Sequence, residues 1–377
     1  MKTDTAILGG GLCGRLAAMM LAERGHRVTL IDKGSRAGEE AAAHIAAAML
    51  APAAEAADAT PETVLLGKKS IPLWRDIAGR LNDAGQPVFM QQNGSLIVWH
   101  AQERPLAVQF ERQLARARAE SVRWNAQDIA EHEPQLAGRF SDGLFLPAEG
   151  QLDNRQILAA LAGRLDGLNV ETLWHTESSP DALRQSGKYG LIVDCRGTGA
   201  KHTWNRPSES PSSRLRGIRG EVLRVYAPEV SLRRPVRLLH PRYPIYIAPK
   251  PDSLFVVGAT QIESESTAPA SVRSGLELLS ALYAVHPAFG EAQILQIQSG
   301  LRPALDHHNP EIRYNAQTRT IETNGLYRHG FMIAPAVAAA AVRLAEALIG
   351  GGRVPESDAE SGLAYIDTAE AVPPSRQ

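Results

Sequence analysis

A candidate ligand-binding motif lies near the N-terminus. It consists of Gly9, Gly11, Gly14 and Asp32. The three glycines form a G-x-G-x-x-G pattern, which allows a tight turn, close approach of the backbone to a diphosphate, and contact between a helix and a sheet. Asp32 follows the next apolar stretch, where a carboxylate can accept hydrogen bonds from ribose hydroxyls. The pattern predicts a dinucleotide-binding site but does not distinguish NAD from FAD. A glycine-rich turn that merely packs is the alternative, and it leaves Asp32 without a role.

A βαβ unit must position these residues. Residues 5–8 form a short apolar run, residues 12–24 carry apolar side chains at helical spacing, and residues 28–31 are apolar again. We therefore expect a strand, a helix and a second strand. In this arrangement the positive end of the helix would face the diphosphate.

Two further features lie beyond the N-terminal unit. The apolar residues 191–194 lead into Gly197 and Gly199, which form a second place where the backbone could meet a nucleotide. NAD dehydrogenases built on a simple Rossmann domain do not require such a turn. After residue 216, alternation of apolar and polar residues indicates an antiparallel sheet with one face available for binding, in the runs 220–226, 236–240, 245–249 and 254–258.

The remaining elements follow from periodicity and from helix and turn signals. We expect helices over 40–50, 60–81, 104–124, 126–133, 153–165, 271–285 and 336–349, and strands over 88–90, 95–99, 140–147, 169–174 and 293–297. Asn93 and Gly94 predict a hairpin turn between the strands at 88–90 and 95–99. Pro335 is expected at the start of the last helix. The glycines and polar residues from position 350 onward predict partial disorder.

Composition and charge narrow the function classes. A chain of 377 residues is long enough for about two domains. Its net charge of −1 gives no electrostatic reason to expect a nucleic acid or an anionic membrane as a partner. Cys13 and Cys195 both lie in predicted nucleotide-binding turns, so we expect a reducing cytoplasm and neither a structural disulfide nor a zinc site. The N-terminus lacks the unbroken apolar core of a signal peptide, and the alanine-rich residues 41–54 are too short to span a bilayer.

Taken in order along the chain, these stretches resemble the D-amino-acid oxidase and glycine oxidase family of flavoproteins. The motifs that carry the resemblance are the N-terminal fingerprint with Asp32, residues 46–50, the turn at Gly197 and Gly199, and the runs 219–221, 246–249, 257–260, 300–303, 325–330 and 334–335. The Gly-Leu-Arg-Pro run at 300–303, followed by Arg-His-Gly at 328–330, is most similar to the bacterial glycine oxidases of thiamine biosynthesis. The resemblance implies FAD rather than NAD.

The resemblance also implies a fold and a set of cofactor contacts. The expected fold is glutathione-reductase-like and of class α/β, with an α+β organisation into two domains. A discontinuous FAD-binding Rossmann domain would comprise 1–85, 146–212 and 300–350, and an antiparallel-sheet substrate domain 86–145 and 213–299, followed by a tail at 351–377. The implied FAD contacts are Gly9, Gly11, Leu12, Cys13, Gly14, Asp32, Lys33, His44, Ala47, Ala48, Met49, Trp174, Gly197, Gly199, Gly300, Arg302, Arg328, His329, Gly330, Phe331 and Met332. Because no cysteine occurs in the substrate half, we expect FAD to be bound non-covalently, and no metal ion is expected.

The catalytic residues implied by the resemblance are Arg302, Tyr246 and Arg328. A guanidinium presents a planar fork that can hold a carboxylate by two parallel hydrogen bonds. An α-amino acid held by Arg302 beside Tyr246 would point its Cα–H at flavin N5, and its imine would hydrolyse to a 2-oxo acid and ammonia. Oxygen would accept the electrons and form hydrogen peroxide. The expected partners are thus a small amino acid or amine and molecular oxygen, with homo-oligomerisation left open.

Each of these catalytic roles has a structural alternative. Arg302 could be a surface ion-pair partner. Arg328 could hold the loop 325–330 instead of assisting the carboxylate. The ring of Tyr246 faces one side of a predicted strand, and that side could be either the cavity or the core.

One segment departs from the family pattern. Three alanines and His44, at residues 41–44, and Ala48 stand where the family usually has hydroxyl-bearing residues and a glycine facing the diphosphate and the flavin. Lost hydroxyl contacts would weaken FAD binding, and a methyl group at Ala48 would crowd flavin N5. His44, His240 and His329 are better explained as structural histidines than as catalytic groups.

Three other functions stay open at the level of sequence. The first is a D-amino-acid dehydrogenase or secondary-amine oxidoreductase that passes electrons to an acceptor other than oxygen. The second is a module that modifies tRNA, although the near-neutral charge and the missing methyltransferase partner speak against it. The third is a flavoprotein without catalytic activity.

Overall fold

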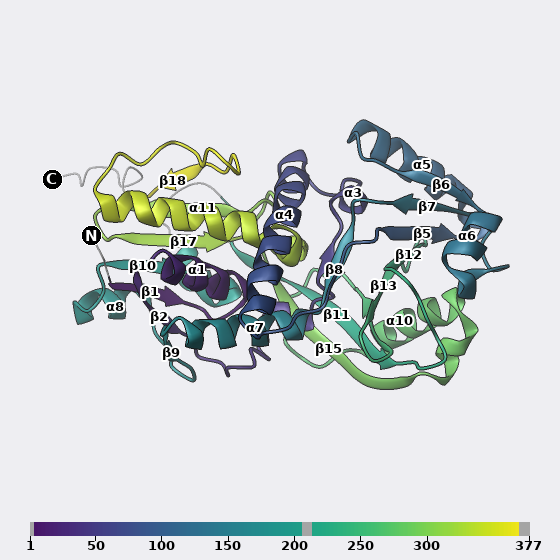
Figure 1. Ribbon diagram of the computed structural model, residues 1–377, viewed down its shortest axis with the longest axis horizontal. Helices are drawn as coiled ribbons and strands as arrows, with labels where there is room; N and C mark the ends of the chain where they lie inside the picture. The colour runs from purple at the N-terminus through teal and green to yellow at the C-terminus, as the bar shows by residue number, and fades with distance from the viewer. Residues whose placement is uncertain (1–3, 206–212, 369–377) are drawn as a thin grey trace.

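Two large sheets organise the computed structural model, which describes residues 4–205 and 213–368 (Figure 1). The first sheet has seven strands in the order β18-β16-β17-β10-β1-β2-β9. These strands are β1 (Asp4–Leu8), β2 (Arg27–Ile31), β9 (Glu171–Leu173), β10 (Leu191–Asp194), β16 (Glu311–Asn315), β17 (Thr320–Asn324) and β18 (Tyr365–Asp367). β1 pairs in parallel with both β2 and β10, which confirms the predicted βαβ unit.

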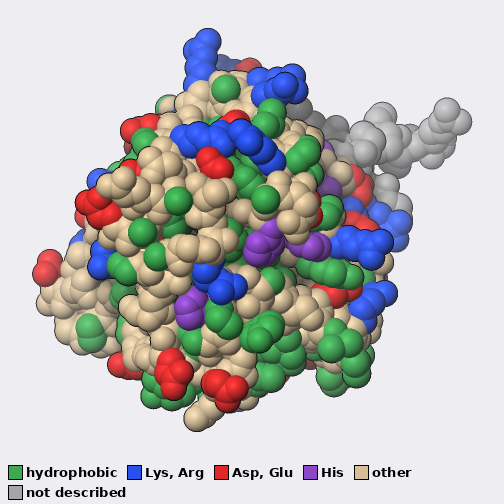
Figure 2. Space-filling model, turned by 90° about the vertical axis from the view of Figure 1, so that its right-hand side faces the viewer, with side chains coloured by type: hydrophobic (Ala, Val, Ile, Leu, Met, Phe, Trp, Pro, Cys, Tyr) green, Lys and Arg blue, Asp and Glu red, His purple; other side chains and the backbone are tan. Residues whose placement is uncertain are grey.

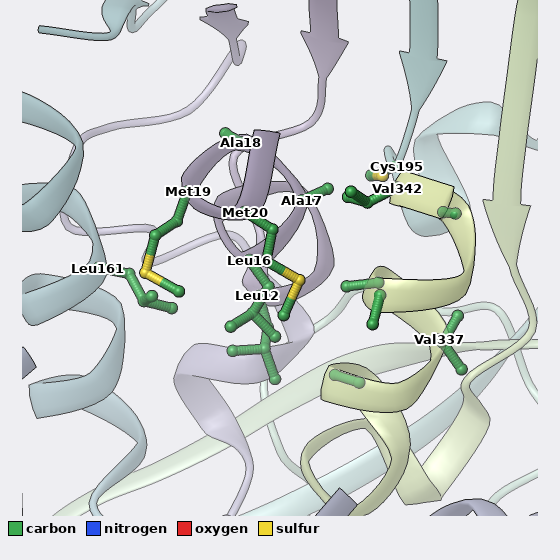
Figure 3. Packing of buried hydrophobic residues seen from close by; sticks show 14 of the residues in the cluster. Leu12, Leu16, Ala17, Ala18, Met19, Met20, Leu161, Cys195, Val337 and Val342 are labelled. Atoms are coloured by element: carbon green, nitrogen blue, oxygen red, sulfur yellow. The ribbon is translucent and has the colours of Figure 1, made fainter. Parts of the chain in front are cut away.

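Helices cover the first sheet because their apolar faces are buried against one another and against the strands. α1 (Leu12–Glu23) packs against α11 (Gly330–Gly350) and α7 (Asn154–Gly167), and α4 (Pro61–Asp83) packs against α11. Figure 3 shows Met19 of α1 facing Leu161 of α7, with Val337 and Val342 of α11 on the other side of α1. The segment Tyr327–Gly350 is long and apolar enough to cross a membrane, but 78% of its most apolar window is buried inside the protein. In this structure its side chains belong to the hydrophobic core beside the first sheet.

α11 begins earlier than the sequence indicated. We expected a helix over 336–349 with Pro335 in its first turn, whereas α11 begins at Gly330 and contains Pro335 in its interior. Proline has no N–H, so the carbonyl of Phe331 loses its usual helical partner. The indole Nε1–H of Trp74 in α4 donates to that carbonyl at 2.7 Å. The prediction was wrong because the compensating donor comes from an element distant in sequence.

The second sheet has eight strands in the order β15-β11-β14-β13-β12-β5-β7-β6. These are β5 (Ser95–Trp99), β6 (Val122–Asn125), β7 (Asp142–Leu146), β11 (Arg216–Tyr226), β12 (Val236–Leu239), β13 (Ile245–Lys250), β14 (Leu254–Gly258) and β15 (Gln293–Ala304). All neighbours are antiparallel except β12 and β5. The alternating runs after residue 216 are therefore confirmed as strands. α10 (Val272–Val285) covers one face with Leu278, Leu282 and Val285.

A small third sheet, in the order β3-β8-β4, connects the two layers. Its strands are β3 (Met49–Leu50), β4 (Met90–Gln91) and β8 (Gly150–Leu152). Figure 1 shows β8 between the two large sheets. The remaining helices are α2 (Ala42–Ile45), α3 (Pro52–Glu55), α5 (Arg104–Arg116), α6 (Ala126–His132), α8 (Pro180–Ser186) and α9 (Lys201–Trp204). The helices predicted over 60–81, 126–133, 153–165 and 271–285 are confirmed by α4, α6, α7 and α10.

Three local predictions were wrong. The helix predicted over 40–50 is shortened to α2, because Met49 and Leu50 pair with β8. The hairpin around Asn93 does not form, since β4 pairs with β8 while β5 pairs with β7 and β12. The helix predicted over 104–124 ends at Arg116, and β6 joins the edge of the second sheet instead. In the first two cases, pairing with a strand distant in sequence overrode local propensity; in the third, β6 pairs with β7, the next strand along the chain.

The described part of the C-terminal segment, up to residue 368, contains a strand of the first sheet. β18 pairs in parallel with β16, so the disorder predicted from residue 350 onward was wrong up to this point. Residues 206–212 and 369–377, which belong to the predicted FAD domain and tail, lie outside the described residues. The proposed domain boundary at residue 300 falls within β15, and the proposed tail contributes β18 to the first sheet.

The surface carries mixed charge. On the face shown in Figure 2, Lys and Arg side chains are interspersed with Asp and Glu and with hydrophobic side chains. Large exposed apolar side chains gather on α10, at Val272, Leu276 and Tyr283, and on β15, at Ile294 and Leu295.

Candidate active site

One cavity of about 1510 Å³ runs between the two large sheets. This volume exceeds the roughly 300–1,000 Å³ of ordinary small-molecule pockets. Its lining includes the glycine turn and Asp32 at one end and Tyr246, Arg302 and Arg328 at the other. Apart from three residues, every predicted cofactor and catalytic residue lines this cavity. The exceptions are Gly14, His44 and Trp174.

The three fingerprint glycines serve different contacts. Gly9 has φ +98°, and a Cβ there would lie 2.7 Å from the carbonyl carbon of Cys195. A Cβ on Gly14 would lie 1.9 Å from the carbonyl oxygen of Gly9, so Gly14 lets the helix close on the turn without facing the cavity. A Cβ on Gly11 would meet only the Cβ of Ala41, at 3.9 Å. Gly11 is thus the position at which the turn opens onto the cavity.

The first turn of α1 offers free hydrogen-bond donors beside this opening. Its N-cap, Gly11, supplies no side-chain cap, and its first turn contains no acidic residue. The unpaired N–H groups and the helix dipole favour an anion at this end. Asp32 is oriented nearby, because its Oδ2 accepts from the N–H of Gly10 at 2.5 Å and its Oδ1 accepts from the N–H of Gly34 at 2.6 Å.

Arg15 holds the turn from behind and was missed in the sequence. This buried guanidinium donates to the carbonyl of Gly10 at 2.6 Å, to that of Leu158 at 2.5 Å and to that of Arg36 at 2.8 Å. Burial lowers the pKa of Arg15 to about 10. Trp174 packs here rather than in the cavity, with its ring centroid 4.9 Å from the Arg15 guanidinium. An arginine inside an apolar helix was the signal that could have identified Arg15.

The segment from Ala47 to Met49 forms the middle of the cavity wall. Ala48 has φ +54°, and its carbonyl accepts from the N–H of Leu152 at 3.0 Å. The ammonium of Lys250, which the sequence analysis also missed, donates to the carbonyls of Ala47 at 2.8 Å and Leu152 at 2.6 Å. Burial lowers the pKa of Lys250 to about 7.

His44 lies behind the cavity wall. Its carbonyl accepts from the side-chain amide of Asn154 at 2.5 Å, and its Nδ1 is buried without a hydrogen-bond partner. Burial lowers the pKa of His44. The role predicted for its side chain at the cofactor has no support in this placement.

Arg302 projects from β15 at the substrate end. Its guanidinium donates to the carbonyl of Arg219 at 3.3 Å and to that of Thr260 at 3.1 Å. In the part of the chain that the structure describes, no carboxylate lies within ion-pairing distance of this group. A Cβ on Gly220 would lie 2.2 Å from the guanidinium carbon, so the facing strand leaves room for the arginine through a glycine. The surface ion pair considered for Arg302 is therefore absent from the described residues.

Tyr246 lines the same end of the cavity from β13. A Cβ on Gly258 would lie 2.5 Å from its hydroxyl, so a second glycine makes room for the ring. Burial raises the pKa of Tyr246 and lowers that of Arg302.

Arg328 forms ion pairs with two carboxylates that the sequence analysis did not predict. Its Nη2 lies 2.6 Å from Oε2 of Glu55 and 3.2 Å from Oδ2 of Asp58, and its Nε lies 2.9 Å from the same Glu55 oxygen. The other oxygen of Glu55 accepts from Nη2 of Arg237 at 2.5 Å. Burial alone would raise the pKa of Glu55, but Arg237 and Arg328 hold it well below its usual range.

His329 and the start of α11 complete the wall. Burial lowers the pKa of His329 to about 4, so its ring is neutral at neutral pH. α11 begins without a side-chain cap or an acidic residue in its first turn, and Gly330, Phe331 and Met332 line the cavity. The cavity therefore meets two uncapped helix N-termini, those of α1 and α11. Among the residues from 4 to 205 and from 213 to 368, no group of three His, Cys, Asp or Glu side chains is arranged to hold a metal ion.

A family model described as FAD dependent oxidoreductase, DAO, matches residues 4–344. The chain belongs to this family of FAD-dependent oxidoreductases. An oxidoreductase of Rhizobium etli named for thiamine biosynthesis, ThiO, is 39% identical over 336 residues, which are 89% of this chain and 94% of the relative. A glycine oxidase of Geobacillus kaustophilus is 26% identical over 345 residues, which are 89% of this chain and 90% of the relative.

Solved structures share the DAO-family fold. The crystal structure of glycine oxidase from Geobacillus kaustophilus superposes with a TM-score of 0.78 at 22% identity, covering 96% of this chain and 98% of that one. The crystal structure of iminodiacetate oxidase from Chelativorans sp. BNC1 gives 0.77 at 19% identity, covering 97% and 99%. The predicted fold class is thereby confirmed, and membership of the family makes this chain an FAD-dependent oxidoreductase.

The residues of this DAO-family cavity fit FAD as its cofactor. An uncapped helix N-terminus and a glycine-lined approach favour a diphosphate, and α1 with Gly11 provides both. A second uncapped helix, α11, meets the cavity at Gly330, where a group that gains negative charge is favoured. When bound, FAD supplies a two-electron acceptor.

Proposed function

We propose that this enzyme oxidises glycine or another small amino acid or amine at the carbon that bears the amino group. The observation that carries the proposal is the state of Arg302: a cationic fork that lines the cavity and bonds only to main-chain carbonyls among the described residues. Such a group can receive a substrate carboxylate by two parallel hydrogen bonds. The names of the glycine oxidase and ThiO relatives support the same substrate class and a place in thiamine biosynthesis.

The chain's own groups orient the substrate. Arg302 binds the substrate carboxylate. Tyr246 lines the same end of the cavity, and its hydroxyl donates a hydrogen bond to that carboxylate. The amino-bearing carbon then faces the cofactor space beside Ala48. Burial keeps Tyr246 protonated, because the pKa of its hydroxyl is raised. Orientation of this kind supplies much of the barrier reduction when no strong base is required. The amine would lose a proton and, to the bound cofactor, a hydride; the resulting imine takes up water to give a 2-oxo acid and ammonia, or a primary amine where the substrate amine is secondary.

We further propose how the cofactor is held. Gly9, Gly11 and the first turn of α1 bind the diphosphate, Asp32 binds the ribose, and the wall from Ala47 to Met49 faces the flavin. Both cysteines, Cys13 and Cys195, line the nucleotide end, so FAD is bound without a covalent link to the substrate half. Oxygen is the proposed final electron acceptor and yields hydrogen peroxide.

Anaerobic mixing of the purified holoenzyme with single amines tests the proposal. The panel comprises glycine, sarcosine, iminodiacetate, D-alanine and D-proline, and the measurement is loss of flavin absorbance. We expect glycine or sarcosine to bleach the flavin, and air to restore its absorbance with formation of hydrogen peroxide. Failure of every amine to bleach the flavin contradicts the proposal. Restoration by an artificial acceptor but not by air identifies a dehydrogenase instead of an oxidase.

A further inference from the structure

We propose that Glu55 is a specificity-determining residue that restricts the site to substrates with a single carboxylate, because it withholds Arg328 and Arg237 from the substrate. The inference rests on the proposed function and extends it from the reaction to the charge of the substrate. The argument depends on how the charges at the substrate end are paired.

Three guanidinium groups and two carboxylates meet at this end of the cavity. They are Arg237, Arg302 and Arg328, together with Glu55 and Asp58. Glu55 bridges two of the arginines, with Oε1 on Arg237 at 2.5 Å and Oε2 on Arg328 at 2.6 Å. Asp58 adds a second carboxylate to Arg328 at 3.2 Å. Of these three guanidinium groups, only that of Arg302 has no carboxylate partner among the described residues.

Glu55 is fixed in this position and stays ionised. Only 12% of its side chain is exposed, and it lies at the end of α3, whose Ala54 N–H donates to Oε1 of Glu149 at 2.6 Å. The neighbouring Arg237 and Arg328 keep the pKa of Glu55 well below neutral pH. His329 lies 3.4 Å from Glu55 but carries no charge at neutral pH, because burial lowers its pKa to about 4.

A second substrate carboxylate therefore finds no free cation at Arg328 or Arg237. Arg302 binds the first carboxylate. In Arg328, both Nε and Nη2 already donate hydrogen bonds to Glu55. A further anion near Arg328 must displace Glu55 or lie beside Glu55 and Asp58, and like charges in contact disfavour binding strongly. The pairing acts against dicarboxylates without adding a contact to monocarboxylates.

The test compares substrates that differ only in the second carboxylate. N-Ethylglycine and iminodiacetate have nearly the same length, but only iminodiacetate carries a second carboxylate. The measured quantity is the ratio of their second-order rate constants for anaerobic flavin reduction by the holoenzyme. We expect the wild type to favour N-ethylglycine by about tenfold or more, as a repulsive contact of about 1.4 kcal/mol requires.

Substitution of Glu55 should collapse this ratio. In Glu55→Gln, Arg328 and Arg237 become available to the second carboxylate, so the preference for N-ethylglycine should fall by about tenfold, mainly through tighter binding of iminodiacetate. Glu55→Asp, which keeps the charge, should retain most of the preference. A merely structural role would alter the rate constants of both substrates and leave their ratio unchanged.

A second variant covers the case in which Glu55→Gln does not fold. The side chain of Asp58 is 67% exposed, so Asp58→Asn leaves the buried packing intact. It should reduce the preference by about threefold, since it removes one of two repelling charges from a solvated position. An unchanged ratio in a folded Glu55→Gln enzyme, or in Asp58→Asn when Glu55→Gln is insoluble, overturns the inference, as does a wild type that uses both substrates equally. If neither substrate nor any amine of the panel bleaches the flavin, the proposed function itself fails.

Discussion

Lys250 and Glu149 are buried side chains that hold the cavity wall through main-chain contacts. Lys250 donates to the carbonyl of Ala47, and Glu149 accepts from the N–H of Ala54. Burial lowers the pKa of Lys250 to about 7 and raises that of Glu149 to about 7. Neither residue could be identified from the sequence, because every residue type carries the backbone groups that they bind, and their side-chain partners, Gln151 and Ser95, lie far away in the chain. The pairing of Glu55 with Arg237 and Arg328 was hidden for a related reason, since the three lie in segments far apart in the chain.

Glu149 predicts a specific pH dependence of stability. Its pKa is about 7 in the folded chain and near 4.5 when exposed, so the folded state holds the proton more tightly. The stabilisation by the protonated form is complete below about pH 4.5 and is lost as the pH rises through about 7. Glu149→Gln cannot titrate, so the free energy of unfolding of the wild type relative to this variant should fall by up to about 3 kcal/mol between pH 5 and pH 8. Urea unfolding at both pH values measures this difference, and a difference independent of pH would refute the assignment.

The N-terminal βαβ unit could be predicted because all of its contacts are local. The glycine turn, α1 and β2 follow one another within about thirty residues, and each is marked by its own pattern. The elements that were mispredicted depend on distant partners: β3 and β4 on β8, and the first turns of α11 on Trp74 of α4. Local sequence patterns thus located the nucleotide end of the site. At the substrate end, Arg302 was identified only through the resemblance to the D-amino-acid oxidase and glycine oxidase family, and Glu55 only from the structure.

The turn at the start of α1 predicts different outcomes for two glycine substitutions. Gly14→Ala places a Cβ 1.9 Å from the carbonyl oxygen of Gly9, so it should destabilise the folded chain by about 3 kcal/mol through overpacking. Gly11→Ala meets only Ala41 at 3.9 Å, so the apoprotein should keep its stability while the Kd for FAD rises by about tenfold or more, because the methyl group occupies the approach to the diphosphate. Thermal unfolding of the apoprotein and quenching of FAD fluorescence separate the two effects.

A third glycine supplies the matched control for this pair. Gly79 lies in α4, and a Cβ there would meet nothing within 4 Å. Gly79→Ala should stabilise the helix by up to about 1 kcal/mol and leave the affinity for FAD unchanged. If Gly11→Ala behaves like Gly79→Ala in the FAD titration, Gly11 does not face the diphosphate.

The molecule as a whole is two sheets joined at one cavity. The first sheet presents the glycine turn and two uncapped helix ends, and the second presents Tyr246 on β13 and Arg302 on β15. The cavity is continuous between them, so in the proposed arrangement a cofactor held by the first sheet would meet a substrate held by the second. The proposed specificity then depends on Arg302, which has no carboxylate partner among the described residues, and on the pairing of Arg237 and Arg328 with Glu55.

The dependence of the rate of flavin reduction on glycine concentration, measured anaerobically in the wild type and in Arg302→Ala, tests this account most directly. The wild type should saturate. Arg302→Ala should retain its FAD absorbance but show a linear dependence, with a second-order rate constant lower by at least about 30-fold, since loss of a charge-assisted carboxylate contact costs at least about 2 kcal/mol. Arg302→Lys should fall between them, because an ammonium keeps the charge but not the fork. Saturation of Arg302→Ala at the same glycine concentration as the wild type would contradict the account.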